Sequence, residues 1–129
     1  MTTTQTFGLD RIWQVAVRVR DVDRGVEFYR DRLGMQLLFQ VPGMAFFQCG
    51  DVTLMLGVAE GPEFDHPSSV IYYAVDDIES AHGVLSARGV RFRDQPHLVH
   101  RAPDHDLWMT FFRDADDNTL ALMSRKARA

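Results

Sequence analysis

The stretch Gln14 to Gly34, QVAVRVRDVDRGVEFYRDRLG, decides the fold, because its hydrophobic period changes part of the way along. Its first residues alternate between valine and other side chains, which is the period-two pattern of a half-buried strand. The alternating valines are Val15, Val17 and Val19. The opening of the stretch therefore predicts a β-strand.

From Asp21 onward the spacing of apolar residues becomes helical. The carboxylate of Asp21 can accept hydrogen bonds from the free N–H groups of a first helical turn, so it is a predicted N-cap. Gly34 is a predicted helix end, since a left-handed position after a helix favours glycine. The apolar positions of this predicted helical face are Val22, Val26, Tyr29 and Leu33.

A second strand-helix unit follows the same design. Val70–Val75 reads as a strand, Asp76 with Glu79 as a capping box, and Gly89 as the helix end. Asp21 and Asp77 lie 56 positions apart, and Gly34 and Gly89 lie 55 apart. The apolar face of the second helix, predicted over 77–88, consists of Ile78, Ala81, His82 and Leu85. The spacing indicates a duplicated chain.

Short β segments separated by turns complete both copies. They are predicted at Met35–Val41, Met44–Cys49, Val52–Val58, Val90–Ala102, Leu107–Arg113 and Thr119–Ser124. We therefore predict an α+β fold with two βαβββ modules, curved sheets and helices on the outside. One domain, 1–129, would contain a first module at 10–58, a linker at 59–69 and a second module at 70–124. Residues 1–8 and 125–129 are predicted to be loosely ordered tails.

Composition narrows the classes of function. The chain has 129 residues, 46% of them hydrophobic, and a net charge of −4. An acidic chain lacks the basic face that a nucleic-acid-binding protein needs, so we expect no nucleic-acid partner. No apolar run approaches a membrane span and no signal peptide is evident, so we expect no membrane partner and a cytoplasmic location. Cys49 is the only cysteine, which fits a reducing compartment.

Several of these motifs resemble one family. The segment Val17 to Met35, with VxVRDVDRxVEFYRDRLGM, resembles the opening of vicinal oxygen chelate proteins, the superfamily of glyoxalase I, bleomycin resistance proteins and extradiol dioxygenases. The segment Phe111 to Met123, FFRDADDNTLALM, resembles the closing motif of that family, FxDPDGNxxEL. The resemblance covers nearly the whole chain and implies the fold, whereas one fold hosts many activities.

The resemblance also implies positions for a metal. In metal-dependent members, four inward-facing positions on the first and last strands of each module bind a divalent cation. By register with the motifs, these positions are Gln14, Met55, Val70 and Ala121. Valine and alanine have no donor atom, and two possible donors do not form a site for a hard or borderline cation. We therefore predict no metal and no other cofactor.

The inward-facing residues suggest a pocket instead. They are mostly apolar, with one phenol, and such a lining suits an aromatic or aliphatic ligand as well as a packed core. Trp108 is a candidate for stacking on a planar ligand. Arg18, Arg91 and Arg93 could recognise a ligand carboxylate, or lie on a solvated strand face. The predicted ligand-binding residues are Gln14, Met55, Val70, Tyr72, Trp108, Ala121 and Met123.

Three histidines offer an alternative. His97 and His100 differ in parity, so a regular strand would point them to opposite faces, while His100 and His105 could meet across a bend at Pro103. The alternative function is therefore a metal-dependent lyase, isomerase or dioxygenase that uses Gln14 and nearby histidines. A third is a metal-free enzyme with Tyr72 or a histidine as acid or base.

The favoured hypothesis is a binding protein. We expect a metal-free concave pocket that holds a small, partly aromatic or apolar molecule. We also expect a homodimer, because open sheets need their edges and concave faces covered, and Val52–Val58 would be an edge with little charge.

Overall fold

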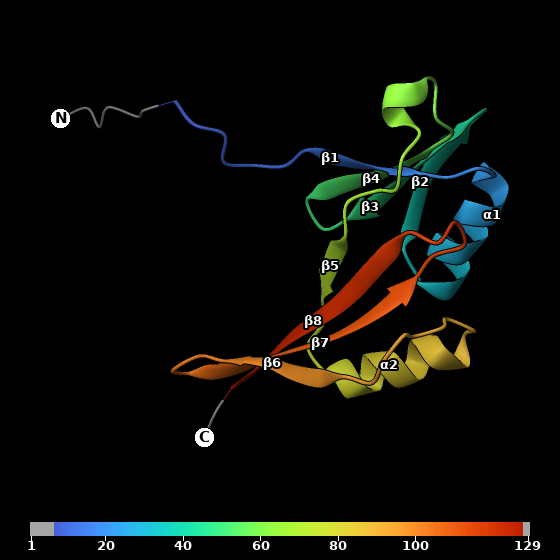
Figure 1. The fold of residues 1–129 in the computed structure, drawn as a ribbon. Coiled ribbons are helices and arrows are strands. Elements are labelled where there is room, and N and C mark those ends of the chain that lie inside the picture. Colours follow the sequence, from blue (N-terminus) through green and yellow to red (C-terminus); the bar gives the residue numbers. More distant parts are fainter. Residues whose placement is uncertain (1–6, 128–129) are drawn as a thin grey trace.

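The computed structural model describes residues 7–127, which form two four-stranded sheets with a helix on the outer face of each (Figure 1). The first module contains β1 (Gln14–Arg18), α1 (Val22–Val26), the π-helix η1 (Glu27–Arg32), β2 (Gln36–Val41), β3 (Met44–Cys49) and β4 (Val52–Gly57). A short 3-10 helix, η2 (Pro62–Phe64), lies in the segment between the modules. The second module contains β5 (Ile71–Ala74), α2 (Ile78–Ala87), β6 (His97–Arg101), β7 (His105–Arg113) and β8 (Thr119–Ala127).

The two sheets repeat one topology. The first sheet has the strand order β1-β4-β3-β2, and the second has the order β5-β8-β7-β6. In each sheet the first strand of the module pairs in parallel with the last, and the remaining pairs are antiparallel. The predicted duplication and α+β fold are confirmed. However, β4 lies inside its sheet between β1 and β3, so the expectation that Val52–Val58 forms an edge is wrong.

The outer faces of the sheets form the core. In the first sheet, Val17, Phe47 and Leu54 are at most 1% exposed and belong to one cluster with the residues of α1 and η1. The second sheet contributes Phe112, Leu120 and other side chains to the same cluster. Burial of these side chains supplies the main driving force for folding. The alternate residues of the same strands are left for the inner, concave face.

The first helix contains an irregularity that its sequence pattern does not predict. Asp21 caps α1 as predicted, since its carboxylate accepts hydrogen bonds from the N–H groups of the first turn. The continuation η1 is a π-helix, in which the N–H of Leu33 donates to the carbonyl of Phe28 at 3.0 Å. The wider turn changes which residues face the core, so Phe28 is buried along with Tyr29 while Leu33 is only half-buried. Gly34 follows with a φ of 76°, as its predicted role requires.

The cap of α2 corrects the predicted capping box. Asp77, rather than Asp76, is the N-cap, and its carboxylate accepts from the N–H of Ser80 at 3.2 Å. Glu79 instead binds the ammonium group of Lys126 on β8 at 2.8 Å. Lys126 shows that β8 continues well past 124, so the prediction of a loose C-terminal tail is wrong for 125–127. Residues 7 and 8 of the predicted N-terminal tail are exposed and have no regular secondary structure. The other predicted tail residues, 1–6 and 128–129, lie outside the described part of the chain.

Both modules carry a bulge at the same place. The pairing of β2 with β3 skips Leu38, and the pairing of β6 with β7 skips Val99. The extra residue reverses the side-chain parity beyond it. The segment 90–102, predicted as one long strand or a bent pair, contains an isolated bridge at Phe92 before β6 begins at His97.

The polar turn between β7 and β8 joins the two modules. Tyr29 donates its hydroxyl proton to Asp114 at 2.7 Å, and the side-chain amide of Asn118 donates to the carbonyl of Arg18 at 3.0 Å. The N–H of Arg20 donates to Asp116 at 3.0 Å. These three turn residues are buried, and hydrogen bonds with the first module satisfy part of their polar groups, although Oδ2 of Asp116 has no hydrogen-bond partner among the described residues. Within residues 7–127, no helix is long and apolar enough to cross a membrane.

Candidate functional site

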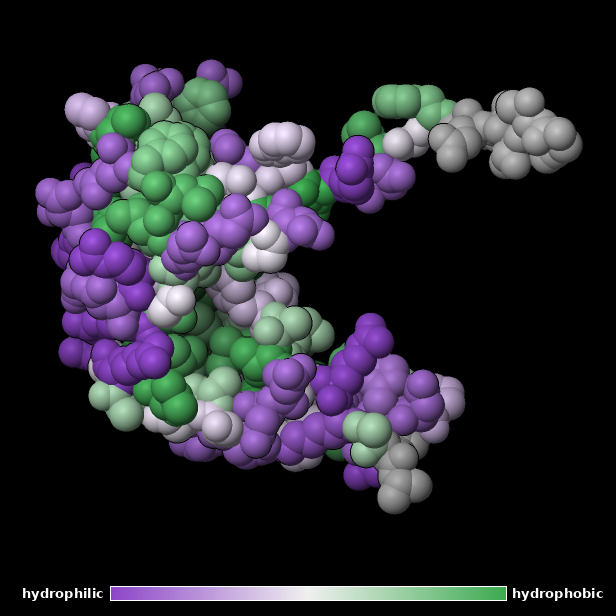
Figure 2. All heavy atoms as spheres, turned by 180° about the vertical axis from the view of Figure 1, so that it is seen from behind, coloured by the Kyte–Doolittle hydropathy of each residue, from purple (hydrophilic) through white to green (hydrophobic). Residues whose placement is uncertain are grey.

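A pocket lies on the inner face of the first sheet. Figure 2 shows the body hollowed on one side, with apolar side chains in the recess between its upper and lower parts. The pocket has a volume of about 550 Å³, which falls within the usual range for small-molecule sites. Its walls come from β1, β3, β4 and the segment that joins the two modules. They include Ala16, Arg18, Met44, Met55, Gly57, Phe64, His66, Ser68 and Ile71.

Arg18 places a positive charge in this otherwise apolar wall. Its side chain is only 17% exposed, and one of its terminal nitrogens lies 3.0 Å from the carboxylate of Asp65. The Nε atom of Arg18 is buried and has no hydrogen-bond partner among the described residues. A buried N–H without an acceptor is costly, so a ligand oxygen at this position would be stabilised. Arg18 is therefore not part of a solvated strand face.

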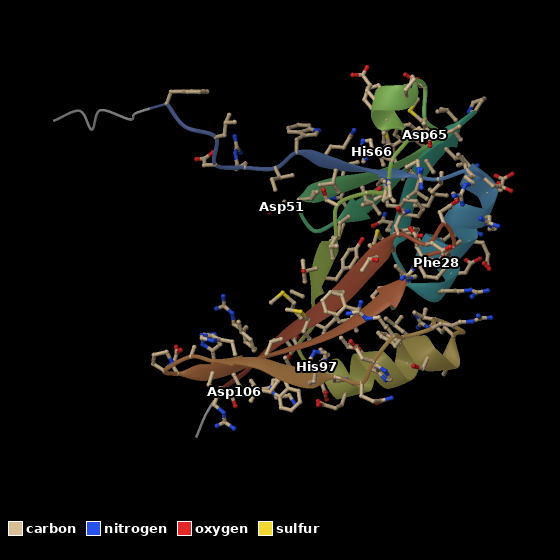
Figure 3. All side chains as sticks on the ribbon, viewed as in Figure 1. Phe28, Asp51, Asp65, His66, His97 and Asp106 are labelled. Atoms are coloured by element: carbon tan, nitrogen blue, oxygen red, sulfur yellow. The ribbon has the colours of Figure 1, made fainter. Side chains whose placement is uncertain are left out.

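The segment before β5 covers one side of the pocket. The hydroxyl of Ser68 accepts a hydrogen bond from the N–H of Arg18 at 3.0 Å, and the N–H of Ser68 donates to Asn118 at 3.3 Å. These bonds hold the segment against β1. Asp65 and His66 follow η2 at this edge of the first sheet (Figure 3). Sequence reasoning treated 59–69 only as a linker, and its proline and glycine content gave no sign that it would line a site.

The predicted metal positions fall into two groups on different sheets. In the first sheet, the amide nitrogen of Gln14 lies 3.8 Å from the sulfur of Met55, so the two possible donors are neighbours on one face. In the second, Val70 precedes β5 and is 40% exposed, while Ala121 on β8 is fully buried. Neither supplies a donor atom, so the residues present do not fit the metal of the metal-dependent family members.

The buried position of Ala121 has a clear cause. Ala121 lies between Tyr72 on β5 and Phe111 on β7 in the strand register, and the two rings contact each other edge to face at 6.0 Å. The two rings therefore cover the small side chain between them. Met123 lies two residues further along the same face and is half-buried. Of the predicted ligand-binding residues, Met55 lines the pocket of the first sheet. Tyr72, Ala121 and Met123 belong instead to the inner face of the second sheet.

Trp108 lies on the other side of the second sheet. Its ring packs against the core cluster, and the ammonium group of Lys126 lies 4.2 Å from the ring centroid. Lys126 in turn binds Glu79 of α2, which places Trp108 on the helix-covered face. Side chains alternate between the two faces of β7, so Trp108 lies on the face opposite to Met109 and Phe111. Trp108 therefore does not belong to the candidate site.

The histidines lie on β6 and β7 of the second sheet. The bulge at Val99 pairs His97 with Met109 and His100 with Leu107, so both histidines share one face. The prediction of opposite faces assumed a regular strand and is wrong. The Nδ1 atom of His105 lies 2.7 Å from Asp104. Among the described residues, no three His, Cys, Asp or Glu side chains are grouped so that they could hold a metal ion.

Cys49 offers little reactivity. Burial raises the pKa of its thiol, which favours the protonated form over the nucleophilic thiolate. Burial also raises the pKa of the Tyr73 hydroxyl, which lies in the core. The polar residues of the pocket are Arg18, Glu60, His66, Ser68 and Ser69, in a wall that is otherwise apolar. Such a lining suits binding of a small molecule with a polar group.

Comparisons with known proteins agree with this fold. Residues 11–122 match the family model of the Glyoxalase/Bleomycin resistance protein/Dioxygenase superfamily. No curated protein sequence matches the chain significantly. The chain is similar to TnmS3, an antibiotic binding protein from Streptomyces sp. CB03234, with 23% identity and a TM-score of 0.75 over 94% of this chain and 100% of that one.

A second solved structure is similar to a comparable degree. Lactoylglutathione lyase from Agrobacterium tumefaciens is 21% identical, with a TM-score of 0.69 over 90% of this chain and 94% of that one. At these identities the likeness concerns the fold. The family model, in contrast, spans most of the chain, from the strand before α1 to the strand after the buried Asp114 turn. The chain belongs to the Glyoxalase/Bleomycin resistance protein/Dioxygenase superfamily.

Proposed function

We propose that the chain binds a small, partly aromatic or apolar molecule in the pocket between the first sheet and the η2 segment, without a metal. The observation that carries this proposal is the lining of the pocket. Its walls are mainly apolar, and the unpartnered Nε atom of Arg18 supplies one donor for an oxygen of the ligand. One directed polar group in an apolar wall fixes the orientation of a ligand while burial supplies affinity.

A relative motivates a binding function in particular. TnmS3 is described as an antibiotic binding protein and has the same fold. The lyase relative would motivate catalysis, but the positions expected to hold a metal include Val70 and Ala121, which carry no donor. The histidines expected to assist belong to β6 and β7, whereas Gln14 belongs to the first sheet. These placements favour binding over the alternative of a metal-dependent lyase, isomerase or dioxygenase.

Titration with 2-naphthoate, an aromatic carboxylate, tests the proposal. In ¹H–¹⁵N NMR spectra we expect the largest shifts at the amides of Ala16, Gly57 and Ser68, which line the pocket. An Ala16→Trp variant would fill the pocket and abolish these shifts. Ala87→Trp, on the exposed end of α2, is the matched control and should leave them unchanged. Shifts that persist in Ala16→Trp would refute the assignment.

Metal analysis tests the absence of a metal independently. We expect purified protein to contain no stoichiometric nickel, zinc, iron or manganese, because a cation between Gln14 and Met55 would lack enough ligands to offset its lost hydration. Elemental analysis after expression in metal-supplemented medium measures this directly. One metal ion per chain that disappears in a Gln14→Ala variant would show that the prediction is wrong.

We further propose a homodimer. The arm before β1 exposes large apolar side chains, with Leu9 at 93%, Trp13 at 84% and Ile12 at 65% exposure. Figure 1 shows this arm extending away from both sheets. A second copy would cover such a surface at low cost, since exposed apolar patches mark interaction sites. Sedimentation at micromolar concentration should give twice the chain mass of 14.7 kDa, and a monomer under these conditions would refute the proposal.

A further inference from the structure

Two arginines lie directly opposite each other at the edge of the second sheet. Phe92 and Phe112 form an antiparallel bridge, and the N–H of Arg93 donates to the carbonyl of Phe111 at 2.8 Å. This register places Arg91 opposite Arg113. Directly opposite residues share a face with their Cβ atoms about 5 Å apart, and like charges in this position destabilise a sheet. Both side chains are exposed, so solvent screens part of this repulsion but leaves two positive charges side by side.

Further arginines surround this pair. Arg91, Arg93 and Arg113 line a cleft of about 780 Å³ whose opposite wall is formed by α1 and η1, including Arg24 and Arg32. Figure 1 shows the end of β7 beside this helical segment, and Figure 3 shows Phe28 at the same place. None of these residues lines the pocket of the first sheet. The cleft is therefore a separate feature on the other side of the module junction.

Most carboxylates in or near the cleft are engaged with groups other than Arg91 and Arg113. Glu27 pairs with Arg32 at 3.3 Å, and Asp114 accepts hydrogen bonds from Tyr29, Asn118 and its own turn. Asp116 forms ion pairs with Arg20 and Arg24. Asp117 also lines the cleft and is exposed, but it forms no ion pair with Arg91 or Arg113. Within residues 7–127, neither of these two guanidinium groups has a hydrogen-bonding or ionic partner.

We propose that this cleft binds the phosphate group of a small molecule between Arg91 and Arg113. A dianion between two guanidinium groups converts their repulsion into two charge-assisted interactions, and the planar fork of arginine matches phosphate oxygens. Arg93 stacks on Phe111 with 4.8 Å between Cζ and the ring centroid, which holds it beside the pair, and its Nε atom lies 3.8 Å from the carboxylate of Asp94. The charge of Arg93 is therefore partly offset, and the phosphate would interact mainly with Arg91 and Arg113. The net charge of the whole chain is −4, so this local excess of arginine is not a general property of its surface.

The aromatic residues of the cleft suggest what the phosphate is attached to. Phe28 is 5% exposed and Phe92 is half-buried, and both line the cleft next to the arginines. An organic phosphate could place an apolar group against these rings, whereas inorganic phosphate could use only the guanidinium groups. Inorganic and organic phosphates would thus use the same guanidinium groups. Only an organic phosphate would also contact the apolar wall.

Calorimetric titration with inorganic phosphate and with phenyl phosphate tests the proposal, with potassium chloride at matched ionic strength as the reference. We expect both phosphates to bind, and Arg91→Gln and Arg113→Gln each to weaken binding at least about tenfold, since one charged hydrogen bond is worth roughly that factor. The matched control is Arg30→Gln, which removes the same charge from an exposed residue paired with Asp31 outside the cleft. Its affinity should equal that of the wild type.

A stability measurement without ligand provides a second readout. If Arg91 and Arg113 repel each other, Arg91→Gln should raise the melting temperature in phosphate-free buffer and lose the increase that phosphate causes in the wild type. Tighter binding of phenyl phosphate than of inorganic phosphate would assign the site to organic phosphates. Absence of binding by both compounds, or equal affinities in the wild type and both variants, would overturn the proposal.

Discussion

In the first module, α1 and η1 bury five residues against their sheet, whereas α2 in the second module buries Ile78 alone. The five are Val22, Gly25, Val26, Phe28 and Tyr29. The two helices follow equivalent strands of a repeated topology, so the difference comes from side chains and not from connectivity. A repeated backbone plan thus tolerates very different depths of helix packing.

The inner faces of the modules differ in a complementary way. The first sheet leaves a pocket beside Ala16 and Met55, while in the second sheet Tyr72 and Phe111 cover the fully buried Ala121. Small and flexible side chains leave room, whereas two aromatic rings fill the equivalent space. The comparison teaches that a duplicated fold can leave a pocket in one copy and fill the equivalent space in the other with its own side chains.

The largest expected effect tests whether α2 depends on a single anchor. Ile78→Ala should destabilise the protein by about 3 kcal/mol, because Ile78 is fully buried and its loss leaves a cavity. Leu85→Ala on the same helix should cost about 1 kcal/mol, since Leu85 is only half-buried. Urea denaturation measures both. Equal losses would show that α2 is held along its whole length, as α1 is.

The next effect compares two tyrosines, one whose buried hydroxyl donates a hydrogen bond and one whose buried hydroxyl has no partner among the described residues. Tyr29→Phe should cost about 2 kcal/mol, because it removes the 2.7 Å hydrogen bond to the buried carboxylate of Asp114. Tyr73→Phe should be neutral or slightly stabilising, since the buried Tyr73 hydroxyl has no hydrogen-bond partner among the described residues. Denaturation of both variants at neutral pH provides the measurement. A large loss in Tyr73→Phe would reveal a partner for its hydroxyl, such as a bound water.

The smallest effect compares one glycine in each helix. An added Cβ at Gly25 would lie 2.9 Å from Leu56 and 3.3 Å from Val19, whereas one at Gly83 would meet nothing within 4 Å. Gly83→Ala should therefore stabilise the protein by up to about 1 kcal/mol through helix propensity. Gly25→Ala should instead lose about 1 kcal/mol, because crowding outweighs the same gain. Stabilisation by both substitutions would mean that Leu56 moves aside freely.

The sequence by itself determined the order of elements and the duplication. The change of period after Val19, the cap at Asp21 and the positive φ values at Gly34 and Gly89 are local properties, and the structure has them where they were predicted. Local hydrophobic period and turn chemistry depend on neighbouring residues, so they can be read without knowing the fold. The family motifs lie in the same local segments, so membership of the superfamily could also be predicted from the sequence.

The tertiary structure decided which side chains meet. Of the predicted ligand-binding residues, Met55 lines the pocket of the first sheet. His66 and Ser68 line it too, but their segment has no periodic pattern from which this position could be predicted. The bulge at Val99 placed His97 and His100 on one face, against simple alternation. The opposition of Arg91 and Arg113 likewise depends on the pairing of distant strands. Register, bulges and the path of a loop are fixed by long-range packing, so no local pattern records them.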